Sequence, residues 1–213
     1  MQSKLGSAVW PLLAAVCAVL MLGPLAVPGR ASEPGDQLRL VGHPKDRFPL
    51  KIFAVPSPEP SWEKVLQVTI SEWNIVFTEA LGKTAFSRTD SETDADIIIR
   101  LVALTFPGMP GRAYVEHDDF GVIKRPVRID LALPLQGVEP KSEPFLVGVA
   151  AHELGHAVGL PHTDSAGSIM CCTSGTPLSD PTVRERYLAA RRNPEVRSVL
   201  RQLRELYPRF WAE

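Results

Sequence analysis

The sequence lacks a strong excess of either charge and contains few cysteines. Its 213 residues include 23 Lys and Arg against 24 Asp and Glu, a formal net charge of −1. Nothing in this balance or elsewhere indicates binding to nucleic acid, so we expect no such partner. The three cysteines are too few for a disulfide framework. The 45% hydrophobic content over this length is sufficient to bury the core of one domain.

Long apolar runs are absent except near the N-terminus. Lys4 precedes an apolar run over residues 8–27, which is interrupted by prolines and followed by small residues ending at Ala31. This pattern predicts that residues 1–31 are a signal peptide, cleaved after Ala31, rather than an uncleaved membrane anchor. We therefore expect a protein that is secreted or resides in the periplasm or cell envelope, without a stable membrane span after cleavage.

The next segment predicts an N-terminal arm and then a single domain. Residues 32–49 are charged and rich in proline and glycine, which is typical of a loose arm. From residue 50 the sequence alternates loosely between apolar and polar residues, which indicates a first strand. We therefore expect the folded domain over residues 50–213. Its predicted strands are 50–55, 97–102, 112–115 and 127–133, and its predicted helices are 62–81, 145–158 and about 194–207. Ser61 and Gly82 are the expected caps of the first helix.

The strongest chemical signal is a run of the form H-E-x-x-H-x-x-G-x-x-H, which begins at His152. His152 and His156 are four residues apart, so on a helix they project from one face and can reach one metal ion. Glu153 points about 100° around the helix, beside that ion. Gly159 permits a left-handed turn that ends the helix, which would bring back His162 as a third ligand.

Three neutral imidazoles predict a catalytic zinc ion rather than a structural one, because they leave the fourth tetrahedral position open for water. The ion would lower the pKa of that water and polarise a substrate carbonyl. Glu153 would then act as general base on the zinc-bound water and return the proton to the leaving amine. The predicted reaction is hydrolysis.

With these residues in place, the chain resembles the metzincin zinc endopeptidases, and most closely the matrixins. These proteins have a methionine-containing turn beneath the metal, and Met170 follows His162 by eight residues. The resemblance implies an α/β (α+β) fold: a mixed twisted sheet with a long helix and an active-site helix, then a small C-terminal part with the Met-turn and a terminal helix. It also implies a monomer that hydrolyses internal bonds of protein or peptide substrates.

The same resemblance implies where a substrate would lie. Val149, one turn before His152, would form a wall of the main specificity pocket together with residues 176–178. A peptide could add as a strand along an exposed edge strand. That strand would comprise Gly111, Arg112, Ala113, Tyr114 and Val115.

Several family features are not reproduced. No cysteine-bearing propeptide is visible, and Cys172 stands where some metzincins have a tyrosine. The connection 105–110 is too short for the insertion that normally holds a second zinc, and no clear motif supports structural Ca²⁺. The acidic loop 116–119 is expected to be a solvated turn, although His117 within it could suggest a second metal.

The adjacent Cys171 and Cys172 leave several alternatives open. They could form a strained bridge or remain as two buried free thiols. A third hypothesis is that one thiolate occupies the open zinc position and holds the enzyme latent. For the whole protein, the alternatives are a zinc-stabilised peptide-binding domain without turnover, and an enzyme that cleaves another amide, such as one in a cell-wall peptide.

Overall fold

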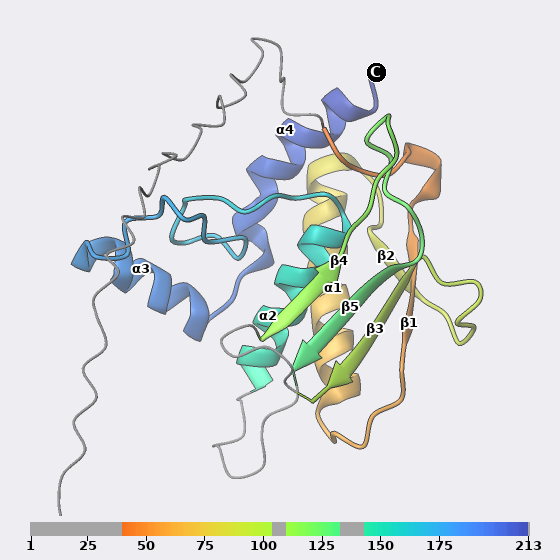
Figure 1. The fold of residues 1–213 in the computed structure, drawn as a ribbon, viewed down its shortest axis with the longest axis horizontal. Helices are drawn as coiled ribbons and strands as arrows, with labels where there is room; N and C mark the ends of the chain where they lie inside the picture. Colours follow the sequence, from red (N-terminus) through yellow and green to blue (C-terminus); the bar gives the residue numbers. More distant parts are fainter. Residues whose placement is uncertain (1–39, 104–109, 133–142, 213) are drawn as a thin grey trace, which may run out of the picture. The chain divides into compact units, whose positions relative to one another are not determined.

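A five-stranded sheet organises the described part of the chain, with the strand order β2-β1-β3-β5-β4 (Figure 1). The first four strands in this order run parallel, and β4 pairs antiparallel with β5 at one edge. The strands are β1 (Leu50–Ala54), β2 (Phe86–Arg88), β3 (Ile97–Val102), β4 (Gly111–Tyr114) and β5 (Val127–Ala132). The predicted mixed sheet is confirmed, whereas β2 was not predicted.

The computed structural model describes residues 40–103, 110–132 and 143–212. All of them belong to one compact unit, residues 38–213. The predicted signal peptide 1–31, the first part of the predicted arm and the connection 104–109 lie outside the described residues, as does residue 133 of the last predicted strand. None of the helices in these three described ranges is long and apolar enough to cross a membrane.

Four α-helices accompany the sheet in the described ranges. They are α1 (Trp62–Leu81), α2 (Glu143–Ala157), α3 (Pro181–Arg192) and α4 (Leu200–Phe210). Short 3₁₀ turns occur at Lys45–Arg47 and Val196–Val199. The predicted terminal helix therefore begins as a 3₁₀ turn at Val196 rather than at Pro194. Helix α3 was not delineated from the sequence.

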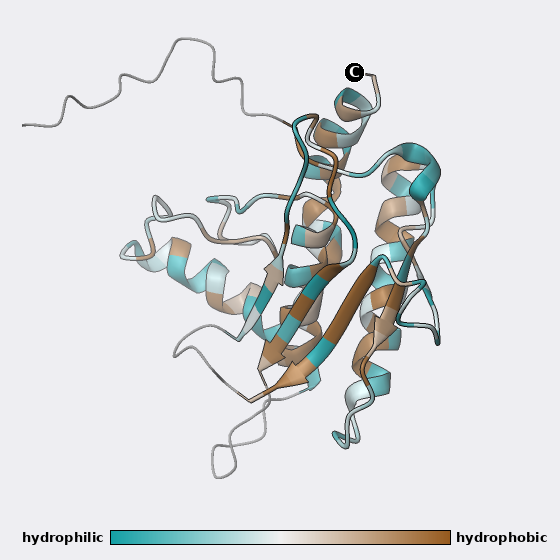
Figure 2. Ribbon diagram, turned by 45° about the vertical axis from the view of Figure 1, so that its right-hand side comes forward, coloured by the Kyte–Doolittle hydropathy of each residue, from teal (hydrophilic) through white to brown (hydrophobic). Residues whose placement is uncertain are grey.

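The sheet is covered by helices on one face. Along β3, Ile97 and Ile99 are buried while Arg100 is exposed, and β1 and β5 show the same alternation. On the outer face Arg100 forms an ion pair with Asp130. Hydrophobic residues dominate the central strands, and α3 is largely hydrophilic (Figure 2). The continuous apolar run of β3 thus forms a central strand, but one buried on a single side.

Helix α1 has the boundaries that its apolar spacing predicts. Trp73 and Phe77 are fully buried, which confirms their expected core role, and Gly82 ends the helix at φ 65°. Ser61 precedes the helix, but its side chain donates to Glu59 and makes no capping hydrogen bond. Ser61 is thus the N-cap residue by position, as expected, and its carbonyl oxygen accepts from the N–H of Val65 over 2.9 Å, but it supplies no side-chain cap. Packing of the apolar face fixes the start of α1 without it.

The prediction of a loose arm over 32–49 was wrong for its described part, residues 40–49. His43 is fully buried and Phe48 nearly so, and Phe48 packs on the rings of Phe77 and Tyr207. The backbone N–H of Gly42 donates to Gly121 over 3.0 Å. Proline and glycine in this segment shape a packed connection, so the domain includes at least residues 40–49.

Candidate active site

Helix α2 carries the metal-ligand motif and packs against α1 on one side and against β4 and β5 of the sheet on another. Its residues Leu154 and Ala150 are fully buried, whereas His152 and His156 are half-buried on the opposite side. The indole N–H of Trp73 donates to the carbonyl oxygen of Ala151 over 3.1 Å. This bond joins α1 to the backbone immediately before His152, so the long helix helps to position the first histidine.

The turn after α2 brings His162 back to the other two histidines. Gly159 has φ 86°, as predicted, and a Cβ there would collide with the carbonyl oxygen of Val41. The N–H of Leu160 donates to the carbonyl oxygen of Gly155 over 2.9 Å, the six-to-one bond of a glycine-ended helix. The packed segment around Val41 therefore also requires a glycine at this turn.

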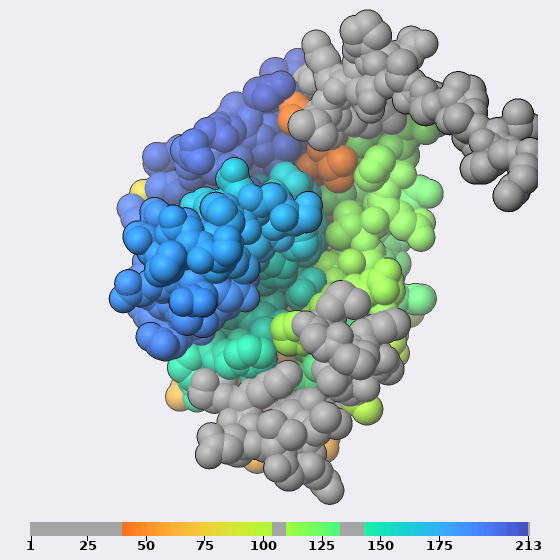
Figure 3. Space-filling model, turned by 60° about the vertical axis from the view of Figure 1, so that its left-hand side comes forward, coloured from red at the N-terminus to blue at the C-terminus, as the bar shows by residue number. Residues whose placement is uncertain are grey.

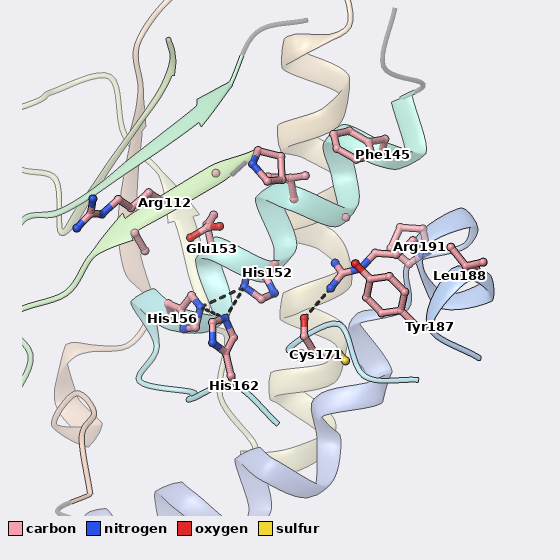
Figure 4. Close-up of a pocket in the computed structure, with 16 residues that line it drawn as sticks. Arg112, Phe145, His152, Glu153, His156, His162, Cys171, Tyr187, Leu188 and Arg191 are labelled. Carbon is pink, nitrogen blue, oxygen red and sulfur yellow. Dashed lines mark hydrogen bonds between the residues drawn. The ribbon is translucent and has the colours of Figure 1, made fainter. Parts of the chain in front are cut away.

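The three predicted metal ligands converge through their Nε2 atoms (Figure 4). The separations are 3.1 Å for His152 and His156, 3.1 Å for His156 and His162, and 3.2 Å for His152 and His162. The Nδ1 atom of His152 lies 2.7 Å from the carbonyl oxygen of Ile169, and that of His156 lies 2.9 Å from the carbonyl oxygen of Leu160. A carbonyl only accepts, so both Nδ1 atoms are the donors.

This tautomer leaves lone pairs on Nε2 of His152 and His156, both directed at the point where His162 also converges. Lone pairs of neighbouring neutral imidazoles do not attract each other, whereas a cation bound between them would be stabilised by both. Zinc–nitrogen bonds of about 2.0–2.1 Å in a tetrahedron place two nitrogens about 3.3–3.4 Å apart. The observed separations are within a few tenths of an ångström of that value. The three histidines therefore fit a zinc ion.

Burial sets the charge states of the site. It lowers the pKa of His152 to about 4, with smaller effects from the hydrogen bond to Ile169 and the charges of His156, His162 and Arg191. Burial likewise lowers the pKa of His156. Both imidazoles are consequently neutral near pH 7, the form that ligates a metal.

Glu153 lies between the histidines and β4 (Figure 4). Only 6% of the residue is exposed, and burial raises its pKa to about 7, against the effect of a hydrogen bond from the backbone of Ala113. A Cβ built on Gly111 would lie 2.8 Å from the Glu153 carboxylate and 2.7 Å from Val149. The absent side chain at Gly111 thus makes room for the carboxylate, a role that the sequence did not reveal.

Met170 lies beneath the histidines, fully buried against α2. A Cβ on Gly155 would collide with its sulfur atom. The turn that contains Met170 is closed by a bond from the N–H of Cys171 to the carbonyl oxygen of Ser168 over 3.0 Å. Cys171 and Cys172 are joined as a disulfide. In this state neither sulfur is a thiolate that could occupy a metal position.

A cleft of about 730 Å³ runs past the three histidines and Glu153. Its walls come from α2, β4 and α3, and the space-filling view shows α2 recessed between the other two (Figure 3). As predicted, Val149 lines the cleft, and so do Gly111, Arg112 and Ala113 of the edge strand. Tyr114 and Val115 do not line it.

The predicted pocket wall at residues 176–178 was wrong. The structure places Tyr187, Leu188 and Arg191 of α3 there instead. The N-cap Asp180, Pro181 and the spacing of these residues could have predicted a helix with the three side chains on one face, but not that this face borders the cleft. Residues 176–178 do form a loop, but this loop precedes α3, and α3 rather than the loop borders the cleft.

The acidic loop at residues 116–119 forms a turn, as expected. The carboxylate of Asp118 accepts from the N–H groups of Phe120 and Val122, both over 2.9 Å. His117 pairs with Ile123 as an isolated bridge. Within the described ranges, the histidine triad is the one group of His, Cys, Asp or Glu residues that could hold a metal ion.

Comparison with known proteins identifies the family to which the chain belongs. No curated protein matches the chain. The solved structure of archaemetzincin from Methanopyrus kandleri is similar over 73% of this chain and 94% of that chain, with 16% identity and a TM-score of 0.41. The matrixin family model matches residues 58–183, more than half of the 213 residues and the whole metal-ligand motif. The chain therefore belongs to the matrixin family of zinc-dependent peptidases.

Proposed function

We propose that the protein is a zinc endopeptidase that hydrolyses internal bonds of peptides or proteins. The observation that carries this proposal is the convergence of three Nε2 atoms beside the buried carboxylate of Glu153. His152, His156 and His162 would hold the zinc ion. When bound, that ion would supply Lewis acidity, which lowers the pKa of water and polarises a carbonyl.

Glu153 is the general base of this proposal. Its carboxylate would accept a proton from the attacking water and transfer it to the nitrogen of the leaving amine. The backbone N–H of Ala113 orients the carboxylate, and Gly111 leaves space for it. Met170 would serve as the turn methionine, a buried support on which α2 and its histidines rest.

The edge strand β4 is the proposed platform for substrate. Among the described residues β4 pairs only with β5, so its other edge faces the cleft without a strand partner. An extended peptide could hydrogen bond to the backbone of Gly111, Arg112 and Ala113, which line the cleft. Main-chain recognition of this kind holds an extended segment of the substrate rather than a chain end, which supports the proposal that internal bonds are cleaved.

The central experiment compares the parent protein with E153Q and H156Q. Peptide-library cleavage is read by mass spectrometry, with and without a zinc chelator, and metal content is measured in parallel. We expect one zinc per chain and cleavage for the parent, retained zinc with a loss of at least a thousandfold in rate for E153Q, and loss of zinc for H156Q. Zinc loading with saturable peptide binding and no cleavage would instead indicate a peptide-binding domain.

We also propose that the protein is exported and acts as a monomer. The support for export is the charged start, the apolar run and the small residues before Ala31. Expression of the full chain should yield a mature protein whose mass and N-terminal sequence begin at Ser32. Retention of residues 1–31 in the exported or membrane fraction would show that the segment is an anchor.

A further inference from the structure

The wall of the cleft formed by α3 differs chemically from the rest of the site. Tyr187, Leu188 and Arg191 all follow residue 183, where the match to the matrixin family ends. The histidines, Glu153 and the edge strand all lie within the matched range. These three residues of the α3 wall thus lie outside the part of the chain that matches the family model.

Arg191 is held in place on this wall. Its Nη2 donates to the carbonyl oxygen of Cys171 over 2.6 Å, and its guanidinium lies 5.0 Å from the centroid of the Tyr187 ring. Figure 4 shows the side chain reaching from α3 toward the Met-turn. The bond to Cys171 uses one of the five N–H donors of the guanidinium. The side chain is therefore positioned while most of its donors remain for another acceptor.

No carboxylate of the described residues forms an ion pair with Arg191. Arg197 and Arg204, by contrast, both pair with the carboxylate of Glu79. Among the described residues that line the cleft, Glu153 is the single one with a carboxylate, and it lies beside the histidines. A half-buried guanidinium in a cleft without a carboxylate partner is an arrangement suited to an anionic ligand.

The surroundings of Arg191 favour an anionic group carried by a substrate residue over a free anion in solution. Phe145, Val149, Leu188 and Pro194 contribute apolar surface to the same cleft. An apolar stem would be buried against them while a terminal charge reaches the guanidinium. Glutamate and aspartate combine these two properties, as does the last residue of a peptide through its C-terminal carboxylate.

We propose that Arg191 forms a carboxylate-binding subsite and directs the enzyme to peptides with an acidic group next to the cleaved bond. This proposal rests on the proposed peptidase function and adds its substrate class. A charge-assisted hydrogen bond in a partly desolvated pocket supports a preference of roughly tenfold or more for acid over amide. Arg191 acts on binding and takes no part in proton transfer.

The test uses pairs of peptides built on the best-cleaved library sequence. One pair differs by Glu or Gln at the position that enters the α3 pocket, and the second differs by a free or amidated C-terminus. For the parent, kcat/KM should favour one of the two acids at least tenfold, and the pair that responds identifies the source of the carboxylate. R191Q should reduce that ratio to about one, and the ratio, rather than the absolute kcat/KM for either peptide, is the readout.

The matched control is R192Q, which removes the neighbouring, exposed arginine of the same helix turn and should leave the ratio unchanged. R191K retains the charge and should retain part of the preference. An Arg191 that merely clamps the Met-turn would behave differently: R191Q would slow all peptides equally and leave the ratio as in the parent, and that result would overturn the subsite. If R191Q does not fold, the parent protein alone provides the test. A ratio near one between its kcat/KM values for the acidic and the neutral peptide would also overturn the subsite.

Binding measurements separate the subsite from the peptidase function. Anisotropy of labelled peptides on zinc-loaded E153Q should show the same acid preference, and the double variant E153Q/R191Q should lose it. Acid-selective binding that depends on Arg191 without cleavage by the parent would contradict the proposed function and support the subsite. Cleavage with no charge preference would contradict the subsite and leave the function intact.

Discussion

The hydroxyl of Tyr207 donates a hydrogen bond to the carbonyl oxygen of Val158 over 2.9 Å, and both residues are fully buried. Val158 follows directly on the last residue of α2, and the preceding carbonyl, that of Ala157, accepts from Nε2 of His43 over 2.9 Å. The last carbonyls of the active-site helix are therefore satisfied by side chains from opposite ends of the domain. This arrangement ties the geometry of the metal site to the global fold.

The Tyr207→Phe variant should lose about 1–3 kcal/mol in the free energy of unfolding, because the Val158 carbonyl stays buried without its donor. Urea denaturation of the zinc-loaded protein measures this loss. Tyr114→Phe is the control, since the exposed Tyr114 hydroxyl lies 3.4 Å from Asp130; it should change stability by less than about 0.5 kcal/mol. Equal stabilities of Y207F and the parent would contradict the role of this bond.

Stability should decrease as the pH falls from about 6.5 to about 4 because of His43. Burial lowers the pKa of His43 from 6.5 to about 4, with smaller effects of nearby Arg47, Asp96 and Arg125. The unfolded chain thus binds a proton in this range that the folded chain does not, so stability is present above pH 6.5 and is lost on acidification.

The full effect would be about 3 kcal/mol, because the pKa of His43 is lowered from 6.5 to about 4 on folding. His43→Gln keeps a donor for the Ala157 carbonyl but does not titrate. Urea denaturation from pH 7 to pH 4 should therefore show that the free energy of unfolding decreases more for the parent than for H43Q as the pH falls. A difference that is independent of pH would show that His43 does not carry the effect.

Gly111→Ala should lower kcat by about a hundredfold while zinc stays bound. The new methyl group would lie 2.8 Å from the Glu153 carboxylate, so either the carboxylate or β4 must move. Peptide cleavage and metal content measure the two properties. Gly167→Ala is the control, because nothing lies within 4 Å of a Cβ at Gly167. Full activity of G111A would show that the contact is not required.

Gly155→Ala should destabilise the protein by about 1–3 kcal/mol despite the higher helix propensity of alanine. The added methyl collides with Met170 and lies 3.4 Å from Trp73. Met170→Ala alone should cost about 2–5 kcal/mol through the cavity it leaves. In the double variant the methyl enters that cavity, so the combined loss should be smaller than the sum. Additive losses in denaturation would rule out the contact.

The sequence by itself was sufficient where short-range spacing determines structure. Four-residue spacing on a helix places His152 and His156 on one face, and a glycine with positive φ after it returns His162. The boundaries of α1 and of β3 likewise follow from the local period of apolar residues. Each of these patterns involves residues close together in the sequence, so it predicts the local structure without knowledge of distant contacts.

Tertiary structure decided the features that depend on residues far apart in the chain. His43 reaches Ala157 across 114 positions and converts an expected loose arm into part of the core. Gly111 is required because Glu153 of another element packs against it, and Arg191 enters the cleft because α3 folds over the Met-turn. Local periodicity contains no information about such contacts, since each arises when burial brings separate elements together.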